Sequence, residues 1–135
     1  MANIIPFSFR GALLQGQHDF ANSGGNTFKL SLYTSNPYTT GSTVYTTSNE
    51  VSSGGGSNYS VKTLTNLGVA SSTAVASVDF DNVTYSSATF TAAFAAIYNG
   101  DTVDSVANRL VVVLDFGGNK TATNGTFTIT FPDPT

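Results

Sequence analysis

The sequence predicts an all-β fold: an antiparallel sandwich or jelly-roll-like domain with a short N-terminal helix or arm. Two observations predict it. Apolar and polar residues alternate with a period of two in several separate stretches, which is the pattern of half-buried strands. Clusters of Gly, Asn, Pro and Ser divide these stretches at short intervals, as turns do in antiparallel sheets. We expect one domain over residues 1–135, with the helix or arm in 1–20 and a β core in 27–132.

The N-terminal segment is the one stretch with helical spacing. A helix is predicted over residues 6–15, with Pro6 near its first position and Gly16 at its exit. Gly11 inside this stretch lowers the helix propensity by about 1 kcal/mol, so an extended arm is the alternative. Four apolar side chains fall at helical spacing and are expected to face the sheet: Ile5, Phe9, Ala12 and Leu13.

The rest of the chain is predicted to form strands and turns. Residues 89–98 are apolar on both faces, which indicates a central strand, although their alanines also permit a helix. The β-branched run in 109–116 is typical of the deepest strand. Residues 39–53 are mostly loop. The predicted strands are 27–33, 59–64, 74–80, 83–85, 89–98, 109–116 and 126–131, and the predicted turns are 54–58, 81–82, 99–101 and 117–119.

The composition disfavours several classes of function. Only 10% of residues are charged, against 40% hydrophobic, and the net charge is −3. The five basic residues are dispersed, whereas nucleic-acid binders cluster them to displace counterions. The absence of cysteine excludes disulfides and thiolate metal sites. No signal peptide and no apolar run of about 18 residues is seen, so we expect neither secretion nor membrane insertion.

The residues that usually carry catalysis are few. His18 is the single histidine, and beside Asp19 it has no nucleophile context, so a surface or turn position is expected. Asp79 and Asp81 share one face of a strand and, with Asp115, leave a glycoside hydrolase as a third possibility. Their spacing matches no calcium loop, and solvated turn acids are the favoured interpretation. We therefore expect no enzyme activity, no cofactor and no metal.

Several short sequence motifs follow one another along the chain in an order that resembles a known group of proteins. The patterns begin at His18-Asp19-Phe20 and are followed by TFKLSLYTS in 27–35, NEVS in 49–52, a glycine-rich stretch, and KTLT in 62–65. The later ones are VTYSSAT in 83–89, AIYN in 96–99, LDFG in 114–117 and NGTFTI in 124–129. Over nearly the whole chain this order resembles small virion proteins of tailed bacteriophages, of the capsid cement or decoration type or minor head–tail components.

The resemblance implies a structural role in the virion, on the capsid surface, after synthesis in the cytoplasm of the bacterial host. The implied partner is the major capsid protein of the same phage, whose subunits the protein bridges, and self-association as a homotrimer is implied. The alternative is a tail- or fibre-associated component that binds host glycan through exposed tyrosines.

Two kinds of residue are candidates for protein contact. Chain ends and loops can become ordered on binding, and tyrosine is enriched at interfaces. The candidate contact residues are Ile4, Ile5, Phe7, Phe9, Tyr38, Tyr45, Gly55, Asn58 and Tyr59.

Overall fold

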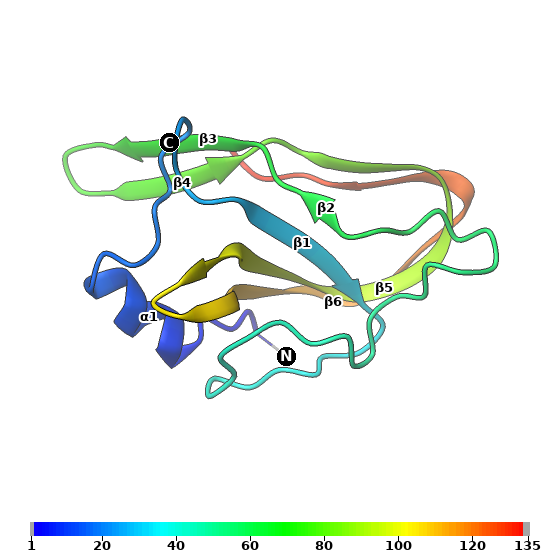
Figure 1. Ribbon diagram of the computed structural model, residues 1–135. Coiled ribbons are helices and arrows are strands. Elements are labelled where there is room, and N and C mark those ends of the chain that lie inside the picture. The colour runs from blue at the N-terminus through cyan, green and yellow to red at the C-terminus, as the bar shows by residue number, and fades with distance from the viewer. Residues whose placement is uncertain (1, 134–135) are drawn as a thin grey trace.

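The chain folds into antiparallel β-structure preceded by one short helix (Figure 1). The computed structural model describes residues 2–133. Within them, strands form a four-stranded sheet in the order β2-β1-β5-β6 and a two-stranded sheet, β3-β4. The elements are α1 (Phe7–Leu14), β1 (Phe28–Tyr33), β2 (Lys62–Thr63), β3 (Asn66–Ser71), β4 (Ala76–Phe80), β5 (Val83–Val103) and β6 (Val106–Ile129). The predicted all-β class and N-terminal helix are confirmed.

Strands β5 and β6 form one long hairpin that contributes to both layers of the sandwich. Their pairing runs from Val83 opposite Ile129 to Val103 opposite Val106, with several register shifts between. Such shifts mark bulges, which bend a strand and increase its twist. In Figure 1 the hairpin turns back on itself, so its open end lies in the layer of β3 and β4 and its closed end lies in the layer of β1. The two layers enclose the core.

Two predicted turns lie inside these long strands. Residues 99–101 belong to β5, and residues 117–119 belong to β6. The chain actually reverses at Asp104 and Ser105, both with positive φ, as a tight two-residue hairpin turn requires. At Gly100 the missing side chain serves close packing, because a Cβ there would lie 3.0 Å from Lys29 Cε. The turn signals in 99–101 therefore reflect packing against β1.

Other boundaries differ in smaller ways. The strand expected over 59–64 is reduced to β2, and β3 occupies residues for which no strand was expected. The long loop between β1 and β2 touches the sheet through isolated bridges, Tyr33 with Glu50 and Val44 with Arg109. Its irregular course follows from hydrogen bonds made by its own tyrosines, described below.

The central part of β5 is buried on both faces, as predicted for a central strand. The main apolar cluster lies between the layers and includes Phe28 and Tyr85. A smaller cluster on the other face packs Tyr38 from the long loop and Ile4 from the N-terminal segment against Leu110. Burial on two faces explains the near-continuous apolar sequence of β5.

Candidate functional site

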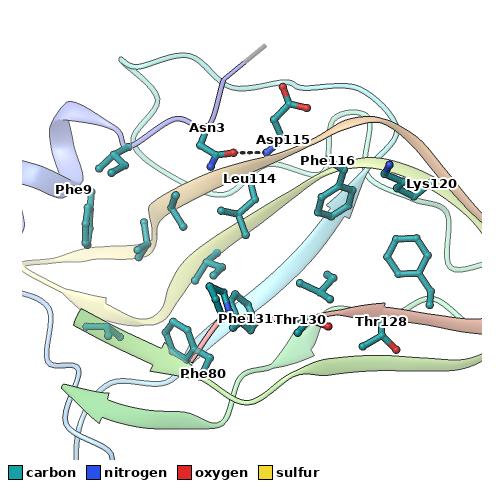
Figure 2. A pocket seen from close by; sticks show the side chains of 18 of the residues that line it. Asn3, Phe9, Phe80, Leu114, Asp115, Phe116, Lys120, Thr128, Thr130 and Phe131 are labelled. Atoms are coloured by element: carbon teal, nitrogen blue, oxygen red, sulfur yellow. Dashed lines mark hydrogen bonds between the residues drawn. The ribbon is translucent and has the colours of Figure 1, made fainter. Parts of the chain in front are cut away.

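An apolar groove of about 1030 Å³ lies between α1 and the two layers (Figure 2). We call it the groove and define it by six lining residues: Phe9, Leu13, Val78, Leu114, Phe116 and Phe131. Residues of β4 line one side of it, and residues of β6 and of α1 line the other. Apolar surface in contact with water gains roughly 25 cal/mol per Å² when it is covered. A cleft of this kind is therefore a binding-site candidate.

The rim of the groove is polar. Asp115 donates its backbone N–H to Asn3 Oδ1 at 2.8 Å (Figure 2). The Asp115 carboxylate accepts the Gly117 N–H at 2.8 Å, and this hydrogen bond holds its pKa below the usual value. Lys120 and the threonines of the last part of β6 complete the rim. An apolar interior with a polar rim is the usual anatomy of a protein contact site.

The apolar surface continues from the groove onto α1. Phe7 and Leu14 are 62% and 90% exposed, and Ile5 and Leu13 are about half exposed. We call these four residues the α1 face. The expectation that Ile5 and Leu13 pack on the sheet is wrong, because within α1 only Ala12 is buried. Large exposed apolar side chains beside an apolar groove make this surface a candidate interaction site.

The predicted contact residues of the N-terminal segment divide into two groups. Ile5 and Phe7 are exposed on the α1 face, where the Arg10 guanidinium lies 4.5 Å from the Phe7 ring centre. Ile4 and Phe9 are partly buried: Ile4 pairs with Val113 of β6, and Phe9 packs against the core. The structure therefore leaves the first pair available for contact and uses the second pair to fasten the segment.

Two of the three predicted tyrosine contacts, Tyr38 and Tyr59, are buried, and Tyr45 is partly exposed. Tyr38 and Tyr59 are each 5% exposed, and Tyr45 stacks on Tyr98 with ring centres 4.4 Å apart. Their hydroxyls are also occupied, because Tyr38 bonds the Tyr33 hydroxyl at 2.6 Å and Tyr59 donates to Glu50 at 2.6 Å. The irregular loop has few ladder partners, so these side chains hold it to the sheet.

The predicted glycine-rich contact loop lies away from the other candidates. Gly55 and Asn58 are exposed, but Figure 1 shows this loop at the opposite end of the sandwich from α1. Asn58 donates its side-chain amide to the Ser87 carbonyl at 2.7 Å, and Ser57 is buried beside it. The loop is thus fastened to the bend of β5 and does not join the groove.

Glu50 is the residue that sequence reasoning overlooked. It is the single glutamate of the chain, and its two carboxylate oxygens accept hydrogen bonds from Tyr45 and Tyr59, each at 2.6 Å. The sequence did contain a signal for this role, because the single glutamate lies close to several tyrosines along the chain. Glu50 organises the long loop on the face of the sheet away from the groove.

The titratable groups considered for catalysis are dispersed. His18 is buried, not on the surface as predicted, because its ring packs 5.0 Å from Phe9 and its Nδ1 lies 3.1 Å from the Asn99 amide. Burial, and secondarily the charge of Arg109, lowers its pKa. Asp79 and Asp81 lie at the end of β4 and in the following turn. Over residues 2–133 no three His, Asp or Glu side chains are grouped to hold a metal.

Comparison with protein-family models, curated proteins and solved structures gives no match to this chain. In the described part of the chain, no helix is long and apolar enough to cross a membrane. The groove and the α1 face are the features from which a function is argued below.

The burial of the tyrosines predicts an abnormal alkaline titration. Burial raises the pKa of all six tyrosines above the ordinary 10.0, and that of Tyr98 to about 12. The folded state then holds its phenolic protons longer than the unfolded chain, so this stability is complete below pH 10 and is lost as the pH rises further. We expect little tyrosinate absorbance at about pH 11 until the chain unfolds cooperatively.

The denatured chain is the control, and its tyrosines should titrate near pH 10. Circular dichroism reports whether the protein stays folded during the titration. Gradual ionisation of several tyrosines near pH 10 in protein that is still folded would contradict the buried arrangement and would mean that these tyrosines are exposed.

Proposed function

We propose that this protein is a structural protein of a tailed-phage virion, of the capsid cement type. On this proposal it acts on the capsid surface after synthesis in the bacterial cytoplasm, and it bridges subunits of the major capsid protein. The observation that carries the proposal is the groove together with the α1 face, an extended apolar surface on a β body. The order of sequence motifs supports the phage virion as the setting.

The proposed occupant of the groove is an apolar segment of the major capsid protein. Complete burial of a side chain such as Phe7 or Leu14 contributes about 1.5–3 kcal/mol. The strands on the groove wall are already ordered, so binding loses little conformational entropy there. A few such contacts per copy, repeated over a shell, add through multivalency. This is a mechanical function in which no bond is made or broken.

The resemblance implies a homotrimer, and self-association of this kind suits a protein that bridges subunits of the major capsid protein. The alternative of glycan binding at the tail has less support, because the hydroxyls of the tyrosines proposed for it are hydrogen-bonded to other residues of this chain and Tyr38 is buried. We therefore keep the capsid as the proposed setting.

Cosedimentation with capsids tests the proposal. Wild-type protein should pellet with capsids that lack it and should raise their melting temperature. The double variant Phe7→Ser, Leu14→Ser should bind at least about 100-fold more weakly, because it removes two large apolar contacts. Both side chains are exposed, so the variant should fold normally.

The matched control is Leu67→Ser, Val75→Ser on the β3-β4 hairpin, because both side chains are about half exposed and neither lines the groove or belongs to the α1 face. It should bind as the wild type does. Equal weakening by both double variants, or no binding by the wild type, would reject the α1 face as the capsid contact.

A further inference from the structure

The last part of β6 is an open sheet edge. One side of β6 pairs with β5 along its length. On its other side, the first half is covered, because Val44 pairs with Arg109 and Ile4 pairs with Val113. Among the described residues, no strand pairs with that side from Phe116 to Phe131. An uncovered edge presents unpaired N–H and C=O groups to any strand that approaches.

Hydrogen bonds show which residues face this open side. Phe131 donates its backbone N–H to Asn82, directly before β5, so Phe131 faces β5. Backbone groups alternate between the two sides of a strand. Thr126, Thr128 and Thr130 therefore direct their N–H and C=O groups outward. No register shift occurs between Phe127 and Ile129, so this part of the edge is straight.

Register shifts interrupt the edge before residue 126, but its last part, from Thr126 to Phe131, lacks the features that usually prevent association. Sheet edges are commonly protected by charged side chains, proline or bulges. From Phe116 to Phe131 the only charged residue is Lys120, and the first proline is Pro132. This stretch is also free of carboxylates in a chain of net charge −3. Two copies can approach here without acidic repulsion.

The residues of this edge are complementary to the same residues of a second copy when the two edges pair antiparallel. A two-fold axis at Thr128 would place Thr128 opposite Thr128, Thr126 opposite Thr130, and Phe127 opposite Ile129 of a second copy. Threonine pairs and aromatic–aliphatic pairs across strands are both stabilising. Within one chain the same pairing already occurs, since the Thr84 and Thr128 hydroxyls lie 3.4 Å apart on neighbouring strands.

Charge favours the same orientation. Lys120 lies near the start of the open edge, and the exposed Asp133 lies just beyond its end. Antiparallel pairing brings the end of one strand beside the start of the other. With the axis at Thr128, each Asp133 lies opposite Thr123 of the second copy, three residues from its Lys120, and no two like charges face each other in the paired stretch.

We propose that two copies of this chain pair through their β6 edges, antiparallel and centred on Thr128, to form a continuous sheet across a two-fold dimer. The three outward threonines each donate a backbone N–H to the second copy and accept one from it. A strand added in the plane of the sheet extends one rim of the groove, opposite α1. This inference goes beyond the proposed function, concerns the isolated protein, and assigns two-fold symmetry where the resemblance implies a trimer.

Solution mass across a concentration series tests the pairing. Light scattering coupled to size exclusion should give twice the 14.0 kDa of one chain for the wild type. Thr128→Pro should give the monomer, because proline removes the central donor of the new ladder. The β5 ladder should survive, since the Thr128 N–H faces outward. Thr128→Lys is the second variant, which keeps the backbone donor and adds a charge at the edge.

Thr84→Lys is the matched control. Thr84 is exposed and opposes Thr128 but belongs to β5, one strand away from the edge. This variant should remain dimeric, and in the wild-type dimer the Thr128 amide should exchange slowly with deuterium. A monomeric or trimeric wild type, or a dimer that Thr128→Lys and Thr84→Lys leave equally intact, would overturn the proposal. Capsid binding is not measured here, so this result is independent of the proposed function.

Discussion

Replacing Phe28 by alanine is expected to lower the free energy of unfolding by about 3–5 kcal/mol. Phe28 is 1% exposed and joins three parts of the fold. Its ring stacks on Phe20 of the N-terminal segment at 4.4 Å and meets the edge of Phe80 in β4 at 5.7 Å. Removing it leaves a cavity between the layers that rigid strands cannot close. Denaturant unfolding followed by circular dichroism measures the loss.

Phe28→Leu is the matched control, because it keeps most of the buried volume and should lose less than about 2 kcal/mol. Phe7→Ala removes an equally large ring from the exposed α1 face and should change stability by less than about 0.5 kcal/mol. Similar losses for Phe28→Ala and Phe7→Ala would mean that the core is not where the structure places it.

Replacing Glu50 by alanine is expected to cost about 2–4 kcal/mol, because hydrogen bonds to charged groups contribute more than neutral ones. The carboxylate accepts the hydroxyl protons of Tyr45 and Tyr59. Without it both phenols lose their acceptor, and the Tyr59 hydroxyl still has to accept the Leu32 N–H of β1. The long loop should then detach more easily, so its amides should exchange faster than those of β5.

Glu50→Gln should have an intermediate effect, since an amide keeps one acceptor oxygen. In a background that already carries Tyr45→Phe and Tyr59→Phe, Glu50→Ala should cost clearly less, because the partners are gone. An unchanged cost in that background would show that Glu50 does not act through the two tyrosines.

Period-two patterns predicted the regular parts of the fold correctly. In β1, Phe28, Leu30 and Leu32 are buried as predicted, but the strand is not half-buried, because Ser31 and Tyr33 on its other face are buried as well. The strand predicted over 126–131 has Phe127 and Ile129 buried and their threonine neighbours exposed. These patterns are local, so a single sequence is sufficient to recognise them.

Features that depend on distant partners were not predictable in this way. Asn99 and Gly100 have turn composition, yet they lie inside β5, where Asn99 bonds His18 and the Gly100 N–H donates to Thr27. Tyr59 is of a residue type that is enriched at interfaces, but its hydroxyl donates a hydrogen bond to Glu50, which the fold of the same long loop brings beside it. In each case the side chain's role is set by the tertiary partner and not by its neighbours in sequence.

The groove and the α1 face were only partly predictable for the same reason. Ile5 and Phe7 were proposed as contact residues from their place in the N-terminal segment, and both are exposed. Leu114, Phe116 and Phe131 line the groove because the β5-β6 hairpin bends and brings its two halves face to face. A bend produced by several register shifts has no simple sequence signal.

The most direct measurement of the central claim is a cryo-electron microscopy map of intact phage particles. Density for this chain is expected on the outer shell, with the α1 face and the groove against the major capsid protein. Density in the tail, or absence of the chain from finished particles, would contradict it.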